Sequence, residues 1–350
     1  MKIYKKIVIY YFTGTGNSKK VAEWISDIAS EMDVETSTIN IVNIDRLHFN
    51  VPEADTLIVF ISPVHGFNYP PIMIHFIMRF PKGENNIALI NTRAGMLIGK
   101  YITPGITGIA FYLSAILLKI KGYSIIAMYP VDLPSNWISV HPGLNHRTIK
   151  YLHVKNKERV SVFTSKIISG KSSFKSLYEI IQDLIFSPVA ILYYFIGRFV
   201  FSKSYFASND CNNCGICINN CPVKAIGLID NRPFWTLNCE SCMKCVSNCP
   251  QKAIEIGHGS IIGIMIIYYS VFVGLFYDFS ETLFYKIENP ISYFIIKTGL
   301  FLILLVIWYR IIHFLMRFKF FERLMVYTSL TKYKFWGKRY KSLNDNEFID

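Results

Sequence analysis

All eight cysteines of this 350-residue chain lie between Cys211 and Cys249. Residues 211–226 and 239–254 share the form C-x2-C-x2-C-x3-C-P-x-K-A-I, so this segment is an internal repeat. Thiolates at this spacing wrap three corners of an iron–sulfur cubane and leave the fourth corner to a more distant cysteine. A zinc ribbon has no use for the third cysteine of each group, and disulfides need an oxidising compartment. The pattern therefore predicts two [4Fe–4S] clusters in a reducing compartment.

The repeat resembles bacterial-type two-cluster ferredoxins over about 50 residues, and every ligand position matches. The resemblance implies a low reduction potential and a fourth ligand taken from the opposite repeat. One cluster would then use Cys211, Cys214, Cys217 and Cys249, and the other Cys239, Cys242, Cys245 and Cys221. Gly215 permits close approach of the backbone to a sulfide, whereas Met243 at the matching position is less permissive.

A second chemical motif lies near the N-terminus, between an apolar run at 7–12 and a helical pattern that begins near residue 18. It consists of Thr13, Gly14, Thr15, Gly16, Asn17 and Ser18. Glycines let a backbone curl around a phosphate, a helix N-terminus attracts its charge, and hydroxyls donate to its oxygens. The loop has neither G-K-[ST] nor G-x-G-x-x-G. It resembles the FMN phosphate loop of flavodoxins, T-G-T-G-N-T, with serine in the last position, which implies bound FMN.

Two later loops fall where flavodoxins hold the isoalloxazine ring, at 62–70 and 91–95. The candidate ring contacts are Pro63, His65, Gly66, Phe67, Tyr69, Thr92 and Arg93. Phe67 and Tyr69 either stack on the ring or pack beneath the loop. His65 is either a hydrogen-bond donor to flavin or a solvated loop residue. Arg93 either stabilises the reduced, anionic flavin or is a surface arginine.

The elements that must position these loops alternate between strands and helices. Apolar runs predict strands at 7–12, 56–61, 86–91 and 123–129, and helical spacing predicts helices at 71–80, 104–121 and 144–169. Such alternation is typical of an α/β, doubly wound parallel sheet. With the loop resemblance, the expected fold is a flavodoxin-like sheet followed by a small α+β two-cluster ferredoxin domain.

This order of parts resembles a family of fused flavodoxin–ferredoxin proteins of anaerobic bacteria, over about residues 5–257. The chain departs from that family at 93–101, where members have a glycine-richer loop, and after Gly259, where it adds apolar segments. The expected domains are a flavin domain at 1–170, a connector at 171–206, a ferredoxin domain at 207–258, a membrane hairpin at 259–318 and a basic tail at 319–350.

Composition points to a membrane. Apolar residues make up 52% and charged residues 17%, which excludes general disorder and is unusual for a soluble domain. Ser260–Tyr277 carries no charge, and a second apolar stretch covers about 291–316. We expect a transmembrane helical hairpin; the alternative is helices that lie on the membrane or pack on the protein. Leu184–Phe201, with an internal proline, is expected to be an interfacial or docked helix, and 102–118 a helix of the α/β domain.

Charge sets the expected orientation. The net charge of the chain is +13. Residues 310–350 carry nine basic and four acidic side chains, a net charge of 9 − 4 = +5. The stretch 278–297, between the apolar segments, carries two basic and three acidic side chains, a net charge of 2 − 3 = −1. The positive-inside rule places the tail, and with it the flavin and cluster domains, on the cytoplasmic side of the cytoplasmic membrane. The expected lipid partner is anionic. Nucleic-acid binding is disfavoured because much of the excess charge adjoins the apolar hairpin.

These features predict a membrane-attached protein that relays electrons between FMN and two [4Fe–4S] clusters. A flavin accepts two electrons and releases them singly, while each cluster passes one. The alternative is a flavin-dependent reductase of a quinone or other lipid-soluble substrate, supplied by the clusters. The redox partner, a protein or a small-molecule acceptor, is not identified by the sequence. No catalytic triad or paired-carboxylate site is evident, which favours the relay.

Overall fold

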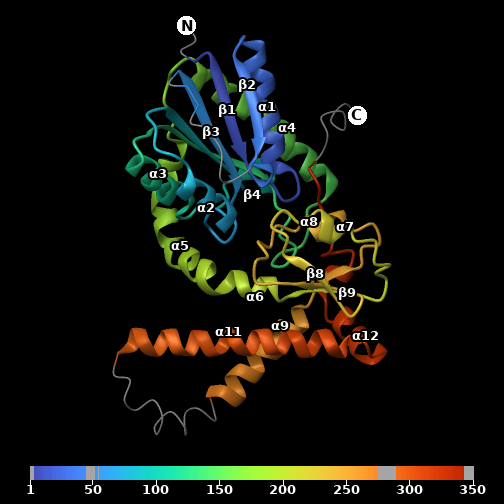
Figure 1. Ribbon diagram of the computed structural model, residues 1–350. Coiled ribbons are helices and arrows are strands. Elements are labelled where there is room, and N and C mark those ends of the chain that lie inside the picture. The colour runs from blue at the N-terminus through green and yellow to red at the C-terminus, as the bar shows by residue number, and fades with distance from the viewer. Residues whose placement is uncertain (1–3, 45–51, 54, 274–288, 343–350) are drawn as a thin grey trace. The chain divides into compact units, whose positions relative to one another are not determined.

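The computed structural model describes residues 4–44, 52–53, 55–273 and 289–342. It divides into two compact units, drawn in Figure 1. Unit 1 comprises 1–137, 143–194 and 339–350, and unit 2 comprises 138–142 and 195–338. These boundaries differ from the expected ones: the connector is shared between the units, and the end of the basic tail belongs with the flavin-type domain.

Unit 1 is built on a parallel sheet with the strand order β2-β1-β3-β4-β6. The strands are β1 (Lys6–Tyr11), β2 (Glu35–Asn40), β3 (Thr56–Pro63), β4 (Asn86–Ile98) and β6 (Ser124–Pro134), and the short β5 (Tyr101–Thr103) pairs antiparallel with the end of β4. β1 and β3 are buried along nearly their whole length, which explains their apolar runs. Counting the five parallel strands in chain order gives 2-1-3-4-5, the flavodoxin-like order, so the predicted fold class is confirmed.

Helices cover both faces of this sheet (Figure 1). α1 (Asn17–Glu31) packs beside α4 (His146–Ile168), and α2 (Pro71–Arg79) packs beside α3 (Ala110–Ile120) on the opposite face. Val21, Trp24 and Ile25 of α1 are buried against the sheet, as their helical spacing predicts. The predicted helices at 71–80 and 144–169 are present with slightly shorter bounds, whereas the one predicted at 104–121 begins only at Ala110, and residues 102–103, also predicted as helix, belong to β5 (Tyr101–Thr103).

Two parts of the sheet differ from the sequence prediction. The search for apolar runs misses β2, because its sequence, Glu-Thr-Ser-Thr-Ile-Asn, is polar except for Ile39 and lies at a partly exposed edge beside β1. Residues 91–95, predicted as a loop, instead continue β4. They remain paired with β6 as far as Gly95, which lies opposite Pro134.

Unit 2 holds the cysteine repeat. β7 (Tyr205–Ala207) pairs with β10 (Ile254–Ile256), and β8 (Ile226–Ile229) pairs with β9 (Arg232–Trp235). The short helices α7 (Ile216–Asn219) and α8 (Lys244–Asn248) each carry the third cysteine of a group. After the repeat come α9 (His258–Ile267), α11 (Pro290–Leu315) and α12 (Lys319–Tyr327). The repeat is the small α+β domain expected.

α11 packs on the rest of unit 2 through one stripe of its surface. Phe301, Leu305, Tyr309 and His313, spaced four residues apart, are buried. The Tyr309 hydroxyl donates to the carbonyl of Tyr205 (3.1 Å) and accepts from the backbone N–H of Trp235 (3.2 Å). The C-terminal third of α11 is thereby fastened to the strands beside the cysteine repeat.

Two helical stretches of the described chain are long and apolar enough to cross a membrane, by length and composition: Lys175–Ser202 and Pro290–Leu315. The first comprises η2 (Lys175–Glu179), α5 (Ile180–Leu192), the π-helical η3 (Tyr193–Gly197) and α6 (Arg198–Ser202). The second, α11, is the predicted second arm of the hairpin. The first arm, Ser260–Tyr277, is helical through α9 and the π-helical η4 (Tyr268–Val273), and its end lies outside the described residues.

Candidate functional site: two cysteine pockets and a phosphate loop

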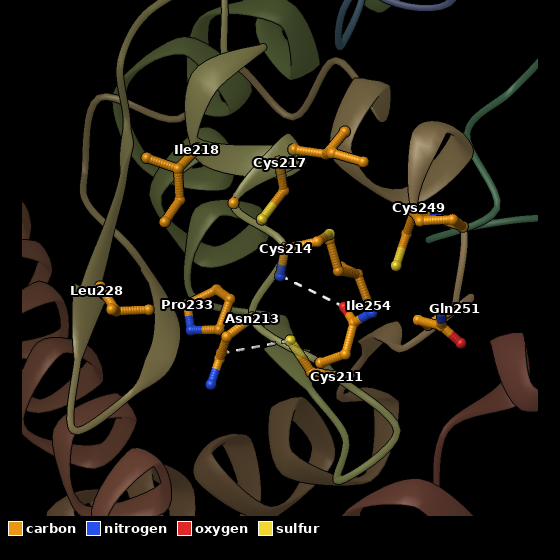
Figure 2. A pocket seen from close by; sticks show the side chains of 14 residues that line it. Cys211, Asn213, Cys214, Cys217, Ile218, Leu228, Pro233, Cys249, Gln251 and Ile254 are labelled. Carbon is orange, nitrogen blue, oxygen red and sulfur yellow. Dashed lines mark hydrogen bonds between the residues drawn. The ribbon is translucent and has the colours of Figure 1, made fainter.

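The first cysteine pocket brings together Cys211, Cys214, Cys217 and Cys249 (Figure 2). Three of these precede or begin α7, and the fourth comes from the end of the second repeat, just after α8. Apolar side chains from β8, β9 and β10 line the same pocket: Leu228, Pro233 and Ile254. The Cys214 residue is exposed to solvent. These are the four residues that the ferredoxin resemblance assigns to one cluster.

The second pocket brings together Cys239, Cys242, Cys245 and Cys221, the other assigned set. Its wall is more aromatic, since it includes Tyr205 and Trp235, which are fully buried and whose rings lie 5.8 Å apart. The exchange of Cys221 and Cys249 between the repeats follows from the fold. Each repeat places its fourth cysteine one turn after a short helix, beside the other repeat's group of three.

Matching backbone conformations precede the two short helices. Gly215 and Met243 both take left-handed φ angles, 73° and 62°. This conformation is costly for a side chain, and Met243 compensates by burial and by accepting a hydrogen bond on Sδ from the Tyr205 hydroxyl (3.2 Å). The less permissive residue identified in the sequence therefore adopts the same turn as glycine.

The thiols fit iron–sulfur chemistry. None of the eight cysteines forms a disulfide. Burial raises the pKa of the Cys217 thiol to about 11 and that of Cys242 to about 12. A metal–sulfide core supplies the positive charge that lets such buried thiols bind as thiolates. In addition, the fully buried indole N–H of Trp235, beside the second pocket, has no hydrogen-bond partner of good geometry among the described residues.

The loop from Thr13 to Ser18 joins β1 to α1 at the carboxyl edge of the sheet. Gly16 caps α1 with a left-handed φ of 112°, and its N–H donates to Thr13 Oγ1 (3.1 Å). Ser18 is buried and shares a hydrogen bond with Thr92 (3.0 Å). Gly14 and Thr15 lie partly exposed at the turn. The curled backbone expected of a phosphate loop is present.

Two asparagines brace this loop. Asn17 donates to the carbonyl of Pro134 (3.0 Å), and Asn136 donates to Thr15 Oγ1. The sequence analysis did not identify Asn136, which follows β6 and has no motif of its own. Its position after a strand of the same sheet edge is the only signal that points to it.

The C-terminal segment 339–342 also lies on the phosphate loop. The Tyr340 hydroxyl donates to Asn17 Oδ1 (2.6 Å) and bonds with Nε2 of buried His153. The N–H of Ser342 donates to the carbonyl of Thr15 (2.9 Å). A Cβ added to Gly16 would lie only 2.7 Å from Cβ of Ser342. We call residues 339–342 the loop strap. No sequence motif predicts this contact.

Residues 63–70 form a tight turn after β3. Pro63 pairs with Thr92, the chain turns with left-handed φ angles at Gly66 (54°) and Phe67 (66°), and a bridge joins His65 to Asn68. The His65 ring lies nearly parallel to Trp137, with centroids 6.5 Å apart. Trp137, which follows β6, is a second residue that the sequence analysis missed.

Tyr69 and Phe67 both pack within the protein. Tyr69 is fully buried, its hydroxyl donates to the carbonyl of Ile90 (3.0 Å), and its ring meets Phe111 edge-on. The ring of Phe67 contacts that of Phe186 in α5 (5.1 Å). Tyr69 therefore packs beneath the loop, whereas Phe67 is only half-buried and its contact with flavin stays a prediction.

Arg93 is a buried member of an ion-pair network. Its Nε donates to Asp132 (2.7 Å), and its terminal nitrogens donate to Glu179 and Thr107. Burial acts to lower the pKa of Arg93, but the two carboxylates outweigh it and hold that pKa above its usual value. Its burial contradicts the predicted surface position, and its role toward flavin stays a prediction. Its guanidinium instead ties β4 to β6 and to η2.

Comparisons with known proteins give one family match and a set of similar solved structures. Residues 210–254 match the family described as the 4Fe-4S dicluster domain. Among solved structures, the chain is similar to a flavodoxin from the domain Archaea, at 14% identity over 47% of this chain and 98% of that one, with a TM-score of 0.31. It is also similar to flavodoxin 1 from Bacillus cereus, at 16% identity over 48% and 99%, with a TM-score of 0.32. No curated protein matches the chain. With the two pockets, the dicluster match assigns two [4Fe–4S] clusters to unit 2 and makes this an electron-transfer redox protein.

Proposed function

We propose that the protein is a membrane-attached carrier that passes electrons between FMN in unit 1 and the two [4Fe–4S] clusters of unit 2. The observation that carries the proposal is the pair of four-cysteine pockets, each drawn from both repeats. Clusters transfer single electrons, whereas FMN exchanges two with a donor or acceptor and passes them on one at a time. One chain with both groups would connect two-electron chemistry to a one-electron partner.

The strand order and the loop support FMN as the group of unit 1. In a 2-1-3-4-5 sheet, ligands bind at the carboxyl edge beside the β1/β3 switch point, where residues 13–18 lie. Backbone N–H groups at the start of α1, with the Thr13 and Thr15 hydroxyls, would hold the phosphate. The ring would lie near His65 and Trp137, whose nearly parallel aromatic faces offer a stacking surface.

Replacing Gly16 by valine is expected to lower the FMN content of purified protein at least tenfold. Valine at a φ of 112° is strained, at a cost of about 1–3 kcal/mol, and its side chain would collide with Ser342. Iron should stay unchanged, because unit 2 is untouched. Flavin and iron analysis on one anaerobic sample measures both.

The matched control is Gly99→Val. Gly99 also has a left-handed φ, 62°, but nothing lies within 4 Å of its added Cβ. It should retain FMN. Full flavin occupancy in the Gly16 variant would show that residues 13–18 do not form the phosphate site.

We also propose that the redox partner approaches the first cluster. Cys214 is exposed, and Asn212 and Asn213 beside it are exposed as well. A cluster whose ligand reaches the surface exchanges electrons over a short distance with a protein docked there. The second cluster, bounded by buried Tyr205 and Trp235, is less accessible.

Membrane attachment is supported by the outer face of α11. Opposite its buried stripe, α11 exposes a second stripe, Ile303, Ile307 and Ile311, each about half accessible. Because the buried stripe of α11 begins at Phe301, only residues 290–300 precede the docked part, and at 1.5 Å per residue they span about 16 Å of an about 30 Å hydrocarbon core. We therefore propose attachment through this outer face. The hairpin crossing depends on residues 274–288, outside the described chain.

The basic end of the chain supports the cytoplasmic orientation and an anionic lipid partner. Arg310, Arg317, Lys319 and Arg323 lie on or beside the exposed apolar surface of α11 and α12 and are themselves exposed. Each basic residue near an anionic surface contributes about 1 kcal/mol. The attached surface would then face the cytoplasmic leaflet.

Changing Ile303 and Ile307 to glutamate is expected to reduce binding to vesicles of phosphatidylethanolamine and phosphatidylglycerol at least tenfold. A carboxylate in the hydrocarbon region is costly, and both positions face away from the rest of unit 2. Flotation of vesicles with bound protein measures this.

The control carries the same two charges on unit 1, as Ile120→Glu with Val162→Glu, at positions that are also highly exposed. It should float as well as the unchanged protein. Equal flotation of all three proteins would rule out the outer face of α11 as the attachment surface.

A further inference from the structure

The two cysteine pockets differ in the charge buried beside them. Lys203, between α6 and β7, is 7% exposed. Its ammonium donates to the carbonyl of Trp235 (2.6 Å) and lies 4.9 Å and 4.7 Å from the ring centroids of Phe234 and Tyr309. Among the described residues, no carboxylate lies within ion-pair distance of it. A buried cation of this kind needs a source of negative charge nearby.

The second cysteine group supplies that charge. Lys203 is fixed next to the second pocket by its hydrogen bond to Trp235, which lines that pocket, and the charge of Cys239 acts on its ammonium. Burial lowers the pKa of Lys203 to about 8, and the Cys239 thiolate opposes the fall. A cubane with four thiolates carries net negative charge and gains one more on reduction. Its presence would therefore keep the ammonium protonated.

A hydrogen-bond donor adds to this cation. The indole N–H of Trp235, orphaned among the described residues, lies beside Cys245 and acts to lower the pKa of that thiol. Donors directed at cluster sulfurs, like nearby positive charge, favour the reduced form. Lys203 and Trp235 thus both act on the second cluster: the indole N–H of Trp235 lies beside Cys245, and the ammonium of Lys203 is bonded to the carbonyl of Trp235.

The first pocket also has a cation beside it, but a carboxylate acts on that cation. The cation that interacts with Cys211 is Arg232, but its guanidinium also interacts with the carboxylate of Glu322, which offsets its charge. The rest of the first pocket is apolar or amide in character, without a lysine or arginine. At the second pocket, Glu240 raises and Lys244 lowers the pKa of Cys242. Because these two charges oppose each other, the positive charge of Lys203 is not offset.

We propose that Lys203 is the buried counter-cation of the second cluster and, with the indole N–H of Trp235, raises its reduction potential above that of the first. The functional meaning of this inference rests on the proposed electron relay. The placement of Lys203 and Trp235 rests on the structure around the second cysteine pocket. A single electron delivered to unit 2 would settle on the second cluster. The first, solvent-exposed cluster would be the point of exchange with the partner.

The test is a redox titration of anaerobically purified full-length protein, followed by electron paramagnetic resonance. Lys203→Met keeps the apolar stem and removes the charge. We expect the higher of the two midpoint potentials to fall by at least the equivalent of a tenfold change in the reduction equilibrium, about 59 mV, while the lower one stays in place. Lys203→Arg should restore most of the difference.

Two controls identify the source of any shift. Lys224→Met removes an exposed charge beside Cys221 and should move neither potential much, because water screens it. Trp235→Phe keeps an aromatic ring without the N–H and should lower the same potential as Lys203→Met. Iron and sulfide content, measured on every variant, reports cluster binding independently of the potentials.

Unchanged potentials in a Lys203→Met protein with full iron content would overturn the proposal, as would equal shifts of both. If the Lys203→Met protein loses iron, the Trp235→Phe protein takes its place in the comparison. Unchanged potentials in the Trp235→Phe protein would also contradict the proposal. FMN content plays no part in this readout, so a failure of the flavin proposal is distinguishable.

Discussion

Replacing Cys211 and Cys249 together by alanine should leave about four iron and four sulfide per chain, half of the unchanged protein's content. Replacing Cys239 and Cys249 together should leave almost none. The reason is that Cys249 shares its pocket with Cys211, whereas Cys239 belongs to the other pocket. Both variants lose two thiols, so the difference depends only on which thiols share a cluster. Iron and sulfide analysis of anaerobically prepared protein measures it.

The reverse pairing provides the matched comparison. Cys239→Ala with Cys221→Ala should behave like the first variant and retain half of the iron, because both residues line the second pocket. If each repeat instead held its own cluster, Cys239→Ala with Cys249→Ala would retain half of the iron. That single result would contradict the exchange of ligands between the repeats.

Replacing Arg93 by methionine should lower the free energy of unfolding of unit 1 by about 3–5 kcal/mol. The substitution leaves Asp132 and Glu179 as buried or partly buried carboxylates without their cation. Thermal unfolding of detergent-purified protein, followed by flavin release, measures the loss. A methionine variant with an unchanged unfolding temperature would show that the network contributes nothing to stability.

The matched control is Lys155→Met, which removes a pair with Glu158 that is exposed on the surface of α4. It should change stability by less than about 0.5 kcal/mol, since water screens both charges. Comparing the two separates the effect of burial from the effect of losing one positive charge.

Sequence reasoning worked where one local feature determines the outcome. The eight cysteines carry their spacing in the chain, and the apolar runs of β1 and β3 report burial on both faces. Residues 13–18 likewise lie between a strand and a helix as predicted, while phosphate binding by them stays a prediction. Each of these signals can be read within a dozen residues, because the physical requirement acts on neighbouring positions.

It failed where distant segments meet. Arg93 lies within β4, but its partners Asp132 and Glu179 lie 39 and 86 residues away, so its burial as an ion pair cannot be predicted from neighbouring residues. Trp137 and Asn136 reach the flavin-type loops only because β6 ends at the same edge of the sheet. Lys203 gives no sequence signal at all, since its environment is built from β9 and α11.

The loop strap has a consequence for the order in which the protein is assembled. Tyr340 and Ser342 contact Asn17 and Thr15, more than 300 positions earlier in the chain. Ribosomes make proteins from the N-terminus, so all eight cysteines emerge before Tyr340 does. Residues 13–18 therefore receive their last neighbours only after the iron-binding segment has left the ribosome, and maturation can insert iron before this end of unit 1 is complete.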